Sequence, residues 1–190
     1  MKRNFFFRTK NAEKYIMTQD VLKNPLIGFA PNAAFLSEVD DSNLVYVGIT
    51  MRELEPEENV FDFETIEKVN HINKWRKEGK HAVFRLICDY PGLEKHLDIP
   101  DWLFDKTGGN GAFYDNAYGK GYSPDYADPD FIECHKRAVN ALGKRYGEDT
   151  FISYIELGSL GHWGEWHIHE GNDLPSIPPE SIQKPICVAI

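Results

Sequence analysis

Side chains capable of chemistry are concentrated in residues 151–169, FISYIELGSLGHWGEWHIH. The segment starts as a short apolar run and continues directly into a glycine-punctuated loop with two Glu, two Trp and three His. A buried strand that ends in such a loop holds acid/base groups and aromatic surfaces at the rim of a scaffold. Two carboxylates that face one cleft can catalyse hydrolysis when their environments separate their pKa values. We therefore predict that Glu165 and Glu156 are the catalytic carboxylates.

The two carboxylates receive different predicted roles. Glu165 lies between Gly164 and Trp166, and an indole neighbour would remove water from the carboxylate and raise its pKa toward that of a general acid. Glu156 is predicted to point inward and to stay ionised beside Arg85. In the alternative, Glu156 takes the chemical role and Glu165 only fixes the loop.

The remaining candidates lie at strand ends or in loops. Arg85 lies inside an apolar strand, where a guanidinium needs a carboxylate partner or an opening. Aromatic rings suit sugars, whose C–H faces are apolar and whose rims are hydroxyls. Glu53 is a further strand-end carboxylate, whereas Glu57 and Glu58 have the pattern of solvated loop charges. The predicted substrate-binding residues are Arg52, Glu55, Arg85, Asp89, Trp102, His162, Trp163, Trp166 and His167.

A metal site is the weaker interpretation of the same loop. His162, His167 and His169 could bind a metal ion together with Glu165. Their spacing differs from the helical H-E-x-x-H pattern, and a histidine beside tryptophan can equally hydrogen-bond hydroxyls. We therefore predict no metal and no cofactor, and a metal-dependent hydrolase stays a third possibility.

Composition limits the class of protein. The chain has 190 residues, 42% hydrophobic, and a formal charge of −9, which predicts one core-bearing domain and excludes a nucleic-acid surface. No run is long enough to span a membrane, and residues 1–10 lack a secretory apolar region. Three widely spaced Cys give neither a disulfide framework nor a zinc pattern, which fits a reducing compartment such as the cytoplasm. We divide the chain into a lead-in (1–23), a domain (24–183) and a tail (184–190) that we expect to be non-native or truncated.

The order of predicted elements indicates a parallel sheet. We predict strands at 28–30, 44–50, 81–88 and 151–157, with 44–50 buried on both faces. Helices are predicted at 64–78, after an Asp62 N-cap, and at 129–146, after Asp128 and Pro129. Residues 89–127 form a long, functional connection in this prediction. A last helix starts within 178–181 and is interrupted at Pro185. The alternation of strand and helix is typical of a βαβ topology.

Two motifs carry a resemblance to known enzymes. Residues 44–63, LVYVGITMRELEPEENVFDF, resemble the segment after the second strand of glycoside-hydrolase (β/α)8 barrels of the β-galactosidase group, through Leu54, Glu55, Pro56 and the 61–63 FDF run. IPDWLFD, residues 99–105, resembles the P-x-W-L element of the same enzymes. Together with NPLIGF and GSLGHWGEWH, the order of motifs is most similar to an uncharacterised bacterial family of glycosidase-like barrel proteins.

The resemblance implies an incomplete TIM (β/α)8 barrel of about the first four βα units. In the family, the fourth strand ends in Asn-Glu and the seventh supplies the nucleophile. Here the fourth ends in Leu157-Gly158-Ser159, and a full barrel needs about 250 residues. We expect a carbohydrate ligand, glycoside hydrolysis in a full-length parent, an inactive isolated chain, and self-association through the open half-barrel. The alternative is a non-catalytic carbohydrate-binding or self-assembling half-barrel.

Overall fold

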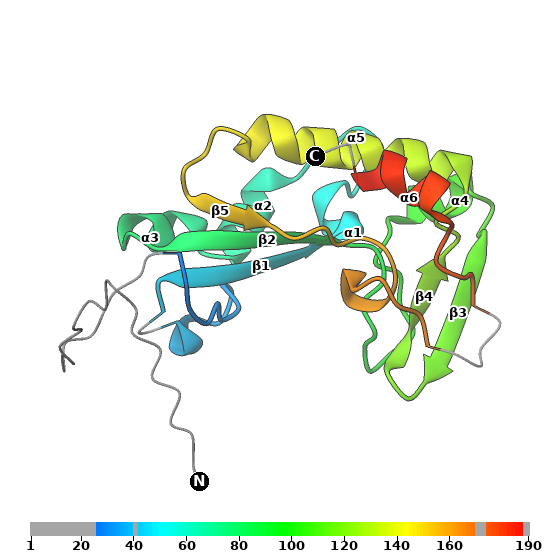
Figure 1. Cartoon of the computed structure of the whole chain (residues 1–190), viewed down its shortest axis with the longest axis horizontal. Coiled ribbons are helices and arrows are strands. Elements are labelled where there is room, and N and C mark those ends of the chain that lie inside the picture. Colours follow the sequence, from blue (N-terminus) through cyan, green and yellow to red (C-terminus); the bar gives the residue numbers. More distant parts are fainter. Residues whose placement is uncertain (1–25, 40–41, 170–173, 188–190) are drawn as a thin grey trace, which may run out of the picture.

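A small parallel sheet lies at the centre of the molecule, with helices along one side (Figure 1). The computed structural model describes residues 26–39, 42–169 and 174–187, so the predicted lead-in over 1–23 lies outside the described residues. Three strands, β1 (Leu44–Thr50), β2 (His81–Ile87) and β5 (Ile152–Ile155), run parallel in the order β1-β2-β5. The protein is therefore a mixed α/β structure in which these three strands pair in the order in which they occur along the chain.

Two of the four predicted strands are confirmed nearly residue for residue, at 44–50 and at 81–88. The predicted strand 151–157 is shortened to β5, although the N–H of Glu156 still donates to the carbonyl of Phe84 (2.8 Å). The predicted strand over 28–30 is wrong. A single parallel bridge joins Asn32 to Tyr46 instead. The ladder stays this short because Pro31 has no N–H and the chain turns directly after Asn32.

The two faces of β1 differ, which corrects the prediction that this strand is buried on both. Val45, Val47 and Ile49 are buried toward the helices. Tyr46, Gly48 and Thr50 alternate with them, are only half-buried, and line a hollow on the opposite face. The sheet therefore has one packed face and one face that is open to a ligand.

The connection from β1 to β2 contains three short helices: α1 (Met51–Leu54), α2 (Phe63–Val69) and α3 (Ile72–Lys77). Asp62 caps α2 as predicted, and Gly79 adopts a positive φ after α3. The single helix predicted over 64–78 is interrupted at His71, which has a left-handed φ of 51°. This change of direction separates the buried Ile66 of α2 from Ile72 and Trp75 of α3.

The long connection after β2 is more ordered than predicted. It contains helix α4 (Asp101–Lys106) and an antiparallel hairpin of β3 (Gly111–Asn116) and β4 (Gly119–Pro124). Its glycines suggested a loop in the sequence, but they make room for aromatic rings. A Cβ on Gly121 would lie 2.6 Å from the hydroxyl oxygen of Tyr114. Neither this helix nor this hairpin was predicted from the sequence.

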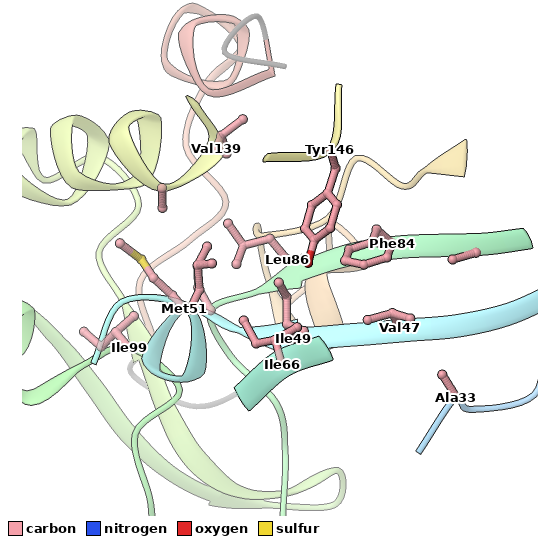
Figure 2. Close-up of a cluster of buried hydrophobic side chains, with 14 of the residues drawn as sticks. Ala33, Val47, Ile49, Met51, Ile66, Phe84, Leu86, Ile99, Val139 and Tyr146 are labelled. Carbon is pink, nitrogen blue, oxygen red and sulfur yellow. The ribbon is translucent and has the colours of Figure 1, made fainter. Parts of the chain in front are cut away.

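Helix α5 (Pro129–Tyr146) has the predicted bounds, since Asp128 accepts two backbone N–H groups at its start. It covers the packed face of the sheet (Figure 1). Figure 2 shows Phe84 and Leu86 of β2 in the same cluster as Val139 and Tyr146 of this helix. Apolar burial of this kind stabilises the fold by about 25 cal/mol per Å² of buried surface. The packing between α5 and the sheet therefore holds the sheet in place, and the hollow lies on the opposite face.

The last element, α6 (Glu180–Cys187), continues past Pro185, where an interruption was predicted. The proline removes one backbone hydrogen bond without ending the helix. In the part of the chain that the structure describes, no helix combines the length and apolar character that a membrane crossing requires.

Candidate functional site

A polar hollow of about 500 Å³ lies at the carboxyl end of the parallel sheet. Its floor is the open face of β1 and β2, and one wall is the loop that follows β5. In Figure 1 this loop (orange) passes below the carboxyl ends of the strands, beside the β3–β4 hairpin. The lining residues are Asn32, Tyr46, Gly48, Thr50, Glu53, Arg85, Ile87, Tyr90, Glu156, Trp163 and Glu165.

Arg85 is at the centre of this hollow and contacts both predicted carboxylates. Its Nε lies 2.6 Å from Oε2 of Glu156, and its Nη1 lies 3.4 Å from Oε1 of Glu165. The Nε–H does not point at the Glu156 oxygen, so that contact is an ion pair without a directed hydrogen bond. Nη1 also donates to the carbonyl oxygen of Trp163 (3.0 Å). The predicted inward direction of Glu156 and its pairing with Arg85 are confirmed. We name Arg85, Glu156 and Glu165 the open cluster.

Glu165 is not desolvated in the way that the sequence indicated. Its side chain is 52% exposed. The neighbouring Trp166 packs against the core and donates its Nε1–H to the carbonyl of Leu157 (2.5 Å). The predicted enclosure of this carboxylate by indole rings is therefore wrong. Glu165 instead meets solvent and an Arg, which suits contact with a polar ligand.

Tyr46 and Glu53 add hydroxyl and carboxylate groups to the hollow. Burial raises the pKa of Tyr46 well above its ordinary range. The positive charge of Arg85 lowers this pKa, whereas the charge of Glu156 and its hydrogen bond with the Tyr46 side chain raise it. The phenol therefore stays protonated and can donate. The Glu53 carboxylate accepts from the backbone N–H (2.7 Å) and hydroxyl (2.9 Å) of Thr50 in a capping box at the start of α1.

Glycines allow the loop after β5 to fold tightly over the strand ends. A Cβ on Gly161 would lie 2.3 Å from the carbonyl oxygen of His167, and one on Gly158 would lie 2.5 Å from Cγ of Arg85. Trp163, within the 3₁₀ turn η2 (His162–Gly164), has a left-handed φ of 54°, which is uncommon for a bulky side chain. Surrounding contacts must therefore hold this turn in place.

A second group of polar residues lies behind the hollow and is sealed from solvent. Nδ1 of His162 lies 2.9 Å from Oδ2 of Asp89, and both side chains have no exposed surface. The hydroxyl of Tyr114 donates to Oδ1 of Asp89 (2.5 Å). The carbonyl of Asp89 accepts the N–H of Trp163 (2.7 Å). We name Asp89, His162 and Tyr114 the sealed cluster. Because it is buried, it positions the turn that carries Trp163 and cannot touch a ligand in this conformation.

Of the nine predicted substrate-binding residues only Arg85 and Trp163 line the hollow. Three of the others, Glu55, Trp102 and Arg52, have partners elsewhere. Glu55 is fully buried and pairs with Arg137 of α5 (2.7 Å), and Trp102 donates its Nε1–H to the Glu55 carbonyl (2.9 Å). Arg52 pairs with Asp101 (2.7 Å). These contacts connect α1 to α4 and α5. The placement of these three residues gives no support to substrate contact, which stays a prediction. The proposed site does not include them.

His167 lies beside the hollow, with its ring 6.0 Å from that of Trp163 and 5.6 Å from that of Tyr118. The sequence interpretation missed Tyr46 and Tyr90. The signal for Tyr46 was the alternation of Val45, Val47 and Ile49 with the less apolar Tyr46, Gly48 and Thr50 along β1, which the assumption of two buried faces concealed. Among residues 26–39, 42–169 and 174–187, no group of three or more His, Cys, Asp or Glu side chains converges to hold a metal ion.

No protein-family model matches the chain, and no curated protein matches its sequence. Among solved structures, a GH5_18 protein from Bifidobacterium longum subsp. infantis is 16% identical, with a TM-score of 0.47, over 77% of this chain and 30% of that one. An endo-glycoceramidase II from Rhodococcus sp., solved as a lactosyl-enzyme intermediate, is 18% identical, with a TM-score of 0.44, over 63% of this chain and 34% of that one. The chain spans about a third of the length of either structure. At TM-scores below 0.5 these similarities assign neither fold nor function.

Proposed function

We propose that the hollow binds a carbohydrate and that the protein is glycoside-hydrolase-like. The observation that carries this proposal is the open cluster: two carboxylates share Arg85 at the carboxyl end of a parallel sheet, facing a hollow of about 500 Å³. In parallel α/β structures, ligands bind at this edge.

The lining groups suit a sugar better than an apolar or an anionic ligand. Glu53, Glu156 and Glu165 accept hydrogen bonds, whereas Arg85 and the protonated Tyr46 can donate. A sugar hydroxyl can use both kinds of partner. Trp163 offers an aromatic face to the apolar side of a sugar ring. Three carboxylates around a single guanidinium would repel an anion.

We expect binding without rapid hydrolysis by this chain. Hydrolysis of a glycoside needs two carboxyl groups that flank the bond, one to donate a proton and one to attack or to activate water. Glu156 and Glu165 both contact the guanidinium of Arg85, and we expect this shared contact to keep them from flanking a glycosidic bond. Incubation with aryl β-galactoside and β-glucoside separates the two outcomes. Steady release of the aryl group that is abolished by Glu165→Gln would show that the chain is a catalyst and not only a sugar-binding protein.

The strand order supports a finer proposal, that the described sheet is part of a (β/α)8 barrel. Asn32 bridges to β1, β1 pairs with β2, and β2 pairs with β5, so the parallel strands lie in space in their order along the chain, with the β3–β4 hairpin inserted between β2 and β5. Tyr154, Ile155 and Leu157, in and just after β5, are each about half exposed, and a further strand would cover them. Self-association at this edge stays a prediction, which analytical ultracentrifugation over a range of concentrations would test.

Saturation-transfer-difference NMR tests the proposed ligand class. The panel contains galactose, glucose, mannose and xylose, each as the monosaccharide and as its β-1,4-linked di- and trisaccharide. At least one sugar should receive saturation from the protein. Arg85→Met should reduce its affinity about tenfold or more, since a hydrogen bond to a charged group contributes about 1.5–3 kcal/mol.

The matched control is Glu58→Gln, which removes a carboxylate paired with Lys106 outside the hollow (2.8 Å). This variant should bind like the wild type. Absence of saturation transfer to every sugar, or equal losses in the Arg85 and Glu58 variants, would refute the proposed function.

A further inference from the structure

We propose that the tip of the β3–β4 hairpin provides a second sugar-binding position, formed by the ring of Tyr118, so that the ligand is an oligosaccharide of at least two residues. This inference rests on the proposed function. It extends the site beyond the hollow, whose lining residues do not include Tyr118.

The tip is fixed beside the hollow by backbone contacts. Asn116 accepts the N–H of Tyr118 through its side-chain oxygen (2.8 Å), which closes the two-residue turn. Gly92 and Lys120 exchange a pair of backbone hydrogen bonds of 2.9 and 2.8 Å. Gly119 has a φ of 135° and packs so closely that a Cβ would lie 2.6 Å from the Gly92 carbonyl oxygen. The position of Tyr118 is therefore set by the fold.

The ring of Tyr118 is supported from within and still 42% exposed. It contacts Trp163 (5.3 Å between ring centroids) and three His rings, those of His162 (5.6 Å), His167 (5.6 Å) and His169 (4.9 Å). An aromatic ring that is already ordered loses little conformational entropy when a ligand stacks on it. Such a surface is preorganised for the apolar face of a sugar.

Trp163 connects the two positions, because it lines the hollow and also contacts Tyr118. A chain of linked sugars that starts over the open cluster can therefore continue over these two rings without leaving aromatic surface. The tyrosines within β3 and β4 cannot stack on a ligand in this way. Tyr114 and Tyr122 are 5% and 1% exposed.

The test is the dependence of affinity on ligand length. Affinities are measured by calorimetry for the mono-, di- and trisaccharide of whichever sugar in the panel binds. In the wild type, one of the two extensions should raise affinity about two- to twelvefold, which corresponds to the roughly 0.5–1.5 kcal/mol of an aromatic contact. Tyr118→Leu should remove this gain and leave the monosaccharide affinity within about twofold of the wild type. Tyr118→Phe should keep the gain.

Phe113→Leu is the matched control, since Phe113 is an equally exposed ring of the same hairpin (41%) that packs against Phe104 and Tyr122 away from Trp163. This variant should retain the gain with length. An unchanged gain in Tyr118→Leu would overturn the inference while leaving the proposed function intact. If no sugar binds the wild type, the proposed function fails and the inference fails with it. If Tyr118→Leu does not fold, nuclear Overhauser contacts between the Tyr118 ring and the trisaccharide decide, and their absence overturns the inference.

Discussion

The open cluster and the sealed cluster are built from similar groups but differ in their access to water. In the open cluster, Arg85 shares its charge between Glu156 and Glu165, whose side chains are 38% and 52% exposed. In the sealed cluster, Asp89 and His162 have no exposed surface. An ionisable group at a solvent-filled hollow can exchange its water for a ligand at low cost, whereas a buried one must keep its partner. The residues of the open cluster are therefore the ones that we propose to contact the ligand, and those of the sealed cluster hold the loop.

Asp89→Ala should have the largest effect on stability. It leaves the ring of His162 and the hydroxyl of Tyr114 buried without their carboxylate, and a buried polar group that loses its partner costs about 1–3 kcal/mol. Urea denaturation measures the free energy of unfolding. The matched variant is Glu156→Gln, which should cost less than about 1 kcal/mol because its ion pair is partly solvated. Equal costs would remove the distinction between the two clusters.

Asp98 is a buried carboxylate that should make stability depend on pH. Its carboxylate accepts the N–H of Tyr90 (2.6 Å) and faces His96, Asp89 and Glu53. Burial raises the pKa of Asp98 to about 6. The folded protein therefore holds this proton more tightly than the unfolded chain does. The contribution to stability is fully present below about pH 4, and it is lost as the pH rises to about 6.

Asp98→Asn isolates this contribution, because the amide oxygen can still accept from Tyr90. Relative to the wild type, the variant should gain roughly 2–3 kcal/mol in the free energy of unfolding between pH 4 and pH 6.5. Denaturation of both proteins at several pH values measures the difference. A difference that does not change with pH would show that burial of Asp98 carries no such cost.

Glu165→Gln should have the smallest effect on stability, below about 0.5 kcal/mol, since its pair with Arg85 is long and exposed (3.4 Å). The same substitution should lower sugar affinity by about threefold or more, because a charged acceptor becomes a neutral amide. Calorimetry and urea denaturation on one preparation compare the two effects. A large loss of stability with unchanged affinity would reassign Glu165 to the support of the loop.

Local signals predicted the regular elements well. β1 is a dense apolar run, and α5 has its start and end marked by Asp128, Pro129 and Gly147. The hairpin escaped prediction because its glycines are required by ring packing, a tertiary cause, while their local pattern is that of a loop.

The candidate site was predictable only where it depends on local signals. Glu156 and Glu165 follow a strand end, and their meeting at Arg85 follows from the parallel sheet. The position of Glu55 could not be predicted, because its partner Arg137 lies 82 positions further along the chain. Burial of Asp89 and His162 depends on the hairpin that supplies Tyr114, so a correct prediction of these roles required the tertiary structure.

We propose that a carbohydrate binds in the hollow against Trp163. The four Trp residues provide the most direct test, because each indole N–H gives its own signal in a ¹⁵N–¹H correlation spectrum. Trp75 and Trp102 donate to the carbonyls of Ala33 and Glu55, and Trp166 donates to that of Leu157. Titration with a binding sugar from the panel should move the Trp163 indole signal in a saturable manner and leave those of Trp75 and Trp102 in place. Saturable movement of the Trp102 signal with a stationary Trp163 signal would contradict binding of the sugar in the hollow.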